Sequence, residues 1–308
     1  MTGKNKKEAY FLAPGMISID SINFFGEYVR SPSKEWILAW TNPPVEVDGA
    51  TVKEFCGRYV LYNFKKDYIA LQGELERAGD GAASNAGTFS IVDKRFRDNS
   101  SACLYVFSES GEVLLERNVA AISASNYISD NGQFVICHTS GSSLPTSECN
   151  LLLFDIDKGK EIFATHAQTR APYKKGYVYE ESTKILTVSI DGYGKFRYNS
   201  DGVFLDNESY LLAQLASDKF DVIIFAGEQI LKEGNSHLTR TVLDNVLRAR
   251  ALVPDNDDGW RSAALKVQGL AYEALGEVSQ AISAFEEALR LNPKVGVKRK
   301  LDDLKKRP

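Results

Sequence analysis

The spacing of hydrophobic residues along the chain changes near residue 206. Before this point apolar residues form short runs, many of them alternating with polar residues and separated by turn-forming residues, as in β-strands. After it they recur every three or four residues, which is typical of amphipathic helices. We therefore predict a multidomain β + α protein, with a strand-rich domain over residues 1–206 and a helical domain over residues 207–308.

Four segments of the first domain have the pattern of two strands around a tight turn. They are residues 58–67, 103–115, 151–163 and 195–205. The aromatic residues before the turns are separated by 45, 47 and 44 positions, and they are Tyr62, Phe107, Phe154 and Tyr198. In three segments a glycine can supply the positive φ angle that a hairpin turn requires. These glycines are Gly111, Gly159 and Gly202.

Further strand-like runs precede three of these hairpins, at residues 88–93, 134–139 and 184–190. About four strands per ~45 residues is the repeat of a propeller blade. The domain thus resembles a β-propeller of the WD-repeat or quinoprotein-like kind, with four or five blades, although it has no Gly-His…Trp-Asp signature. Ile17–Ile22 is a candidate N-terminal strand that closes the ring against the last blade. A β-sandwich with repeated hairpins is the alternative fold.

Residues 262–295 carry the clearest pattern in the helical domain. Leu265, Gly269, Tyr272, Ala281, Phe285, Ala288 and Pro293 occupy the positions of a 34-residue repeat. This segment resembles a tetratricopeptide repeat, with Gln268 where that family usually has Leu. The resemblance implies a helical hairpin in which Gly269 and Ala281 allow close approach, Tyr272 and Phe285 fill the interior, and Asn292-Pro293 ends the second helix.

Other helices are expected at residues 209–216, 219–232, 236–252 and 294–306. Asp218 and Ser236 are candidate N-caps for the second and third. Aligning Pro254 with Pro293 gives a degenerate second repeat, in which Ile230 and Val246 replace the usual Gly and Phe. One clear and one degenerate repeat fall short of the roughly three that stabilise a solenoid.

Composition narrows the function. The net charge of -4 gives no general attraction to nucleic acid or to anionic lipid. No apolar run approaches the ~18 residues of a membrane span, and the N-terminal apolar segment is too short for a signal peptide. We therefore expect a cytoplasmic protein. The cysteines contain no CxxC pair, which argues against structural zinc, and they are Cys56, Cys103, Cys137 and Cys149.

Several residues could in principle form a chemical site, but each has a simpler explanation. Asp255, Asp257, Asp258 and Gly259 weakly resemble a calcium loop, yet no acidic residue stands at the closing position. We interpret them as a linker that caps the next helix. His138 is close to Cys137 and Ser140, while His166 and His237 are isolated. We assign no catalytic, cofactor-binding or metal-binding residue, and no cofactor.

Two polar segments and one basic segment are further candidates. Residues 79–87 and 138–143, the latter containing Gly141, are predicted to be loops without a phosphate-binding motif. The basic C-terminal run is predicted to be a solvated last helix, and nucleic acid binding is unlikely because no aromatic residue lies among its charges. Its basic residues are Lys294, Lys298, Arg299, Lys300, Lys305, Lys306 and Arg307, against Asp302 and Asp303.

Three functions are compatible with these patterns. The leading hypothesis is a non-enzymatic scaffold or adaptor that binds a peptide or partner protein. The second is a subunit that assembles with itself through the helical domain, with Phe220, Ile223, Ile224 and Phe225 as exposed contributors, unless these residues are core between helix and propeller. The third is an enzyme with a small-molecule site in the propeller centre.

Overall fold

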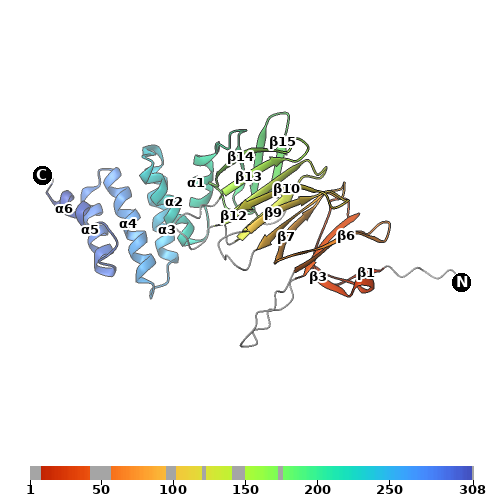
Figure 1. Ribbon diagram of the computed structural model, residues 1–308. Coiled ribbons are helices and arrows are strands. Elements are labelled where there is room, and N and C mark those ends of the chain that lie inside the picture. The colour runs from red at the N-terminus through yellow and green to blue at the C-terminus, as the bar shows by residue number, and fades with distance from the viewer. Residues whose placement is uncertain are drawn as a thin grey trace. The chain divides into compact units, whose positions relative to one another are not determined.

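The computed structural model describes residues 8–41, 57–94, 102–119, 123–140, 150–172 and 176–306. The chain divides into two compact units (Figure 1). One is strand-rich and extends to Ile190, with Arg197–Leu205 added. The other is helical and extends from Asp206, with Asp191–Phe196 added.

The strand-rich unit contains four antiparallel sheets among the described residues. The first has the order β1-β2-β3-β4-β5-β6, the second β10-β9-β8-β7, the third β11-β12-β13-β14 and the fourth β15-β16-β17. The strands of the first sheet are β1 (Ala9–Ala13), β2 (Met16–Ile19), β3 (Phe24–Arg30), β4 (Trp36–Thr41), β5 (Gly57–Asn63) and β6 (Tyr68–Leu75). Those of the second are β7 (Ala78–Ala83), β8 (Phe89–Lys94), β9 (Ala102–Phe107) and β10 (Val113–Val119). Those of the third and fourth are β11 (Ser123–Ile128), β12 (Phe134–Ser140), β13 (Asn150–Asp155), β14 (Lys160–His166), β15 (Tyr177–Glu180), β16 (Ile185–Ile190) and β17 (Gly194–Tyr198).

Each of the first three sheets contains four strands that follow one another in sequence, which is the organisation of a propeller blade. The predicted hairpins β5–β6, β9–β10 and β13–β14 are present. In the fourth, only the bridge between Tyr198 and Phe204 follows β17. The turn glycines have the expected positive φ angles, +89° at Gly111, +58° at Gly159 and +75° at Gly202. The prediction of a propeller-like domain is therefore confirmed by the strand order.

The four aligned aromatic residues are buried. Tyr62 packs among residues of the first sheet, whereas Phe107 and Phe154 lie in clusters that join successive sheets. Between the first and second sheets, Trp36, Leu38 and Trp40 pack in one cluster with Phe89 and Phe107. A second cluster joins residues of the second and third sheets. Large apolar side chains on facing strands thus stabilise each sheet-to-sheet contact by removing apolar surface from water.

The N-terminal segment does not pair as predicted. Within Ile17–Ile22, only Ile17–Ile19 are in a strand, and this strand, β2, pairs with β1 on one side and β3 on the other. Pairing with the last blade is therefore wrong. The physical reason is local: a tight turn at Gly15, with φ of +82°, folds β1 back on β2, and a left-handed Asn23 then leads into β3.

The helical unit contains six α-helices among its described residues. They are α1 (Asn207–Leu215), α2 (Phe220–Lys232), α3 (Thr239–Leu252), α4 (Asp258–Ala274), α5 (Val278–Leu291) and α6 (Lys298–Lys305). A short 3-10 helix, η2 (Ser236–Leu238), precedes α3. The predicted caps at Asp218 and Ser236 are wrong, since α2 and α3 begin after Lys219 and Leu238 without a side-chain cap. Gly296, with φ of +84°, delays the last helix to Lys298.

The tetratricopeptide pattern folds as predicted. A Cβ atom on Gly269 would lie 2.5 Å from the Phe285 ring, so only glycine lets this ring pack against α4. Ala281, Phe285 and Ala288 are fully buried, and α5 ends at Leu291, before Asn292-Pro293. The confirmed pattern residues are thus fold residues of the hairpin α4–α5.

The hairpin α2–α3 repeats this geometry with a shifted alignment. In α2, Gly227 lies close to α3. A Cβ atom on Gly227 would lie 3.1 Å from Val242 Cγ1 and 3.1 Å from Val246 Cγ2. Gly234 and Gly276, both with φ of +76°, end α2 and α4 in the same way. The bond from Asn235 N to Ile230 O corresponds to that from Glu277 N to Tyr272 O.

Ile230 therefore corresponds to Tyr272, and its predicted equivalence to the glycine is wrong. The extra residues Ser236–Leu238 form η2 after this turn, and they displace the helices of the degenerate repeat relative to each other.

Candidate functional site

A groove in the helical unit runs across α2, α4 and α6. These are the first helices of the two successive hairpins and the helix that follows them. The groove has a volume of about 460 Å³. Its residues are Glu228, Leu231, Lys232, Lys266, Leu270, Glu273, Ala274, Gly296, Val297 and Lys300. Among its apolar members, Leu231 and Leu270 are partly exposed and Ala274 is exposed, whereas Val297 is buried in the core of the unit.

Charged side chains border this apolar surface and join neighbouring helices. Lys266 Nζ of α4 lies 2.7 Å from Glu228 Oε1 of α2, with both side chains about three-quarters buried. Lys300 Nζ of α6 lies 2.9 Å from Glu273 Oε2 of α4. These ion pairs connect the three helices and place both charge signs at the border of the groove.

A second cavity, of about 530 Å³, lies in the strand-rich unit. It is lined by strands β3, β7 and β11. Strand β7 is an edge strand of the second sheet and β11 an edge strand of the third, while β3 lies next to the β1–β2 hairpin in the first sheet. We call it the inner-strand cleft. Its aromatic and charged lining residues are Glu27, Tyr28, Arg30, Trp40, Asp80, Tyr127 and Asp130.

Asp80 occupies a special position in this cleft. The pairing of β7 with β8 shifts between Gly79 and Gly81, so Asp80 is the extra residue of a β-bulge, a feature that redirects side chains. Asp80 Oδ2 accepts a 2.7 Å hydrogen bond from Asn126 N of β11. Burial raises the pKa of Asp80, while the Asn126 donor and Lys94 act in the opposite direction.

Residues 79–87 were predicted to be a loop, but their first part is strand β7, and this prediction is wrong. The run forms a strand because it pairs with β8, and its residues are small because bulky side chains of β4 occupy the space beside it. A Cβ atom on Gly81 would lie 2.7 Å from Leu38 Cδ2 and 3.0 Å from Trp40 Cζ3. The turn begins only at Ser84, which accepts a hydrogen bond from Gly87 N.

His138 does not pair with Cys137. The two residues are successive in β12, so their side chains point to opposite faces of the sheet. His138 Nδ1 lies 2.8 Å from the Tyr177 hydroxyl, and burial lowers the pKa of His138 to about 4. Burial raises the pKa of Cys137 to about 12, so its thiol stays protonated. His138 thus serves as a neutral polar link between β12 and β15.

The other histidine candidates are not brought together. His166 is exposed at the end of β14, and His237 Nε2 lies 3.3 Å from Glu208 Oε2 in the helical unit. The first part of the predicted polar loop, residues 138–140, belongs to strand β12, so this part of the prediction is wrong. Residues 141–143 lie outside the described residues, as do Cys56 and Cys149.

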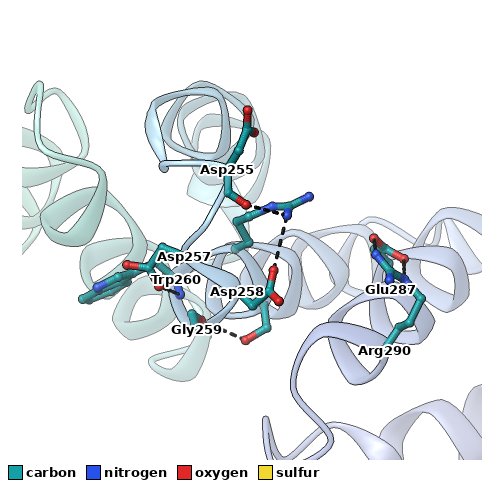
Figure 2. Close-up of polar contacts among 9 residues, drawn as sticks. Asp255, Asp257, Asp258, Gly259, Trp260, Glu287 and Arg290 are labelled. Atoms are coloured by element: carbon teal, nitrogen blue, oxygen red, sulfur yellow. Dashed lines mark hydrogen bonds and ion pairs between the residues drawn. The ribbon is translucent and has the colours of Figure 1, made fainter.

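The acidic linker does not form a calcium loop (Figure 2). The Asp257 carboxylate accepts a hydrogen bond from Trp260 N and caps α4. Asp258 pairs with Arg261, and the backbone oxygen of Asp255 accepts from the same arginine. Figure 2 shows the Asp255 side chain directed away from Asp257 and Asp258. The described residues contain no group of three or more acidic, histidine or cysteine side chains that could hold a metal ion.

The C-terminal basic residues are partly used inside the helical unit. Lys300 pairs with Glu273, and Lys305 Nζ lies 2.6 Å from Glu286 Oε1.

Ile223 and Ile224 are buried in the core of the helical unit with residues of α3 and α4, so they are not part of an exposed patch. Phe225 is 63% exposed. Among the helices that the structure describes, none is long and apolar enough to cross a membrane.

Sequence reasoning missed the residues of both cavities. Asp80 lies within a Gly- and Ala-rich segment, and Glu27 and Tyr28 belong to a strand for which no repeat was recognised. The groove residues Lys266 and Leu270 lie in the recognised repeat, and the helix periodicity that places them on one face was available in the sequence.

Comparisons with known proteins give one family match. The tetratricopeptide repeat family model matches residues 262–295. A search of curated proteins found no significant match.

Similar solved structures share little sequence with the chain. They include a HIRA fragment, with 15% identity over 90% of this chain and 80% of that chain and a TM-score of 0.37. TolB from Acinetobacter baumannii has 11% identity over 64% of this chain and 49% of the TolB chain, with a TM-score of 0.34. The Dos1 propeller has 8% identity over 60% of this chain and 47% of the Dos1 chain, with a TM-score of 0.37. The matched region spans about half the length of the TolB and Dos1 chains. The order of the strands in the sheets and the family match show that this protein has a propeller-like strand-rich unit, followed by helices that include a tetratricopeptide repeat.

Proposed function

We propose that this protein is a non-enzymatic adaptor that binds an extended or helical segment of a partner protein in the groove of α2, α4 and α6. The groove carries this proposal because stacked helical hairpins present extended surfaces of this kind to their ligands. Its accessible apolar side chains, those of Leu231, Leu270 and Ala274, suit apolar side chains of a partner. The lysines and glutamates at its border suit a segment with charges of both signs.

A peptide-display selection on the full chain tests this proposal. Selected peptides should bind the unmodified protein and lose at least about tenfold in affinity with Leu270→Lys, which puts a charge on the apolar surface. The matched control is Leu247→Lys, on α3 outside the groove and 40% exposed, which should change affinity less than about twofold. Peptides that respond to Leu247→Lys and not to Leu270→Lys would contradict the groove as the binding surface.

Self-association is a second candidate, favoured by one observation. Phe225 is largely exposed, and its ring centroid lies 5.4 Å from that of Trp260, which also contacts Phe220. Exposed aromatic clusters often mark interaction surfaces. Light scattering on the full chain should then give a mass above that of a monomer, and Phe225→Ser should reduce it. A monomer at all concentrations excludes this candidate.

An enzymatic site in the inner-strand cleft has less support. Catalytic carboxylates usually occur with a second group whose pKa is shifted to complement them. Among the described lining residues, Asp80 is the carboxylate with a raised pKa, beside Tyr127, whose pKa is also raised by burial. We therefore favour binding over catalysis.

A further inference from the structure

The inner-strand cleft has features of a binding site separate from the helical groove. Apart from Asp80, strand β7 carries only Gly and Ala, so the cleft remains open beside it. The aromatic side chains of Tyr28, Trp40 and Tyr127 contribute to its wall. A cavity of about 530 Å³ with aromatic walls and a few polar groups has the size and lining typical of ligand sites.

The charges in the cleft favour a positively charged ligand. Three carboxylates, those of Glu27, Asp80 and Asp130, line it. They outnumber the two nearby cations, the Arg30 guanidinium in the lining and the Lys94 ammonium, which also acts on Asp80. The Arg30 guanidinium lies 4.0 Å from the centroid of the Phe11 ring and 5.5 Å from that of the Tyr28 ring, so both rings already engage this cation. Aromatic faces also attract cations, so the rings of Trp40 and Tyr127 act in the same direction as the carboxylates.

The hydrogen bonds of Asp80 indicate which kind of cation fits. Oδ2 accepts from Asn126 N, whereas Oδ1 has no hydrogen-bond donor among the described residues. A guanidinium binds a carboxylate best through both oxygens, while an ammonium is a compact charge that needs only one. With one carboxylate oxygen lacking a donor from the described part of the chain, Asp80 therefore suits an ammonium better than a guanidinium.

We propose that the inner-strand cleft binds an alkylammonium group, such as a lysine side chain or a free amine, through Asp80 Oδ1 and the surrounding aromatic rings. This site is independent of the helical groove. It gives the strand-rich unit a recognition role of its own.

The first test uses the full chain and three capped amino acids. Nα-acetyl-lysine methylamide should shift the backbone amide NMR signals of Gly81 and Asn126. The neutral norleucine analogue should bind at least about tenfold more weakly, and the arginine analogue more weakly than lysine. Equal binding of norleucine, or tighter binding of arginine, would overturn the proposal. Putrescine distinguishes the source: binding tighter than the lysine probe supports a free amine, and weaker binding supports a protein lysine.

Variants connect this binding to the cleft. Asp80→Asn keeps an oxygen for Asn126 N but removes the charge, and should weaken lysine binding at least about tenfold. The control Glu112→Gln makes the same charge change in the exposed turn between β9 and β10 and should have no effect.

A second pair of variants tests the aromatic wall. Tyr127→Leu should weaken lysine binding, while Tyr127→Phe, which keeps the ring, should not. These two remain informative if Asp80→Asn fails to fold, and unchanged binding in Tyr127→Leu and Asp80→Asn would contradict the site. Loss of peptide binding in Leu270→Lys without loss of lysine binding separates this site from the groove.

Discussion

The helical and strand-rich units use small residues for the same physical purpose, but the sequence reveals it in only one of them. Gly269 makes room for Phe285 in α4–α5, and Gly81 makes room for Trp40 between β7 and β4. In the helical unit the glycine belongs to a 34-residue pattern and was correctly interpreted. In the strand-rich unit it lies in a Gly- and Ala-rich run that resembles a loop. A small residue is therefore informative only when the position of its large neighbour is also known.

The largest expected effect comes from removing the large partner in the helical unit. Phe285→Ala should destabilise this unit by about 3–5 kcal/mol, because it leaves a cavity beside Gly269. Hydrogen exchange measured by mass spectrometry should show loss of protection over α4 and α5, and retained protection over β5 and β12. Equal loss of protection in both regions would show that the two units unfold together.

The strand-rich unit should be the more sensitive to acid. His138 has a pKa of about 4 in the folded protein, below the ordinary value of 6.5, because it is buried as a neutral ring. The unfolded chain then binds the extra proton first as the pH falls. The free energy of unfolding should therefore decrease by up to about 3 kcal/mol as the pH falls from 6.5 to 4.

Urea unfolding at several pH values measures this effect. His138→Asn lowers stability at neutral pH but should make the decrease between pH 6.5 and 4 smaller than in the unmodified protein. The difference between the two proteins removes the contribution of the carboxylates they share. An identical pH dependence would show that His138 is not responsible.

A smaller effect is expected from filling the space beside Trp40. Gly81→Ala should destabilise the strand-rich unit by about 2 kcal/mol, because the added methyl group meets Leu38 and Trp40. Thermal unfolding followed by circular dichroism measures it. Ala82→Ser is the matched control, since Ala82 is next in the same strand and only half-buried, and it should change stability less. No effect of Gly81→Ala would mean that the small residue is not required.

The smallest effect concerns the linker before α4 (Figure 2). Asp257→Ala removes the cap on Trp260 N and should lower the stability of the helical unit by about 1 kcal/mol. Asp255→Ala is the matched control, because Asp255 contributes its backbone oxygen to Arg261 and should change stability little. Added calcium should stabilise neither variant nor the unmodified protein. A calcium-dependent increase in melting temperature would contradict the capping role.

The second helical hairpin shows how far sequence reasoning reached. The pattern suggested a degenerate repeat but placed Ile230 at the glycine position. The structure places Gly227 there, since η2 inserts extra residues after the Gly234 turn. A fixed repeat length cannot detect an insertion whose only consequence is a displaced helix. The matched hydrogen bonds at Gly234 and Gly276 revealed it.

The sequence by itself determined the strand-rich and helical character of the two regions, the turn glycines, the buried aromatic repeat and the hairpin α4–α5. These features depend on local periodicity and on backbone angles that few residues can adopt. Tertiary structure alone decided that β2 pairs with β3, that Ala78–Ala83 is a strand, and that Asp80 lies in a cleft with Tyr28 and Tyr127. These features depend on which distant side chains occupy neighbouring space, and periodicity along a single chain does not contain that information.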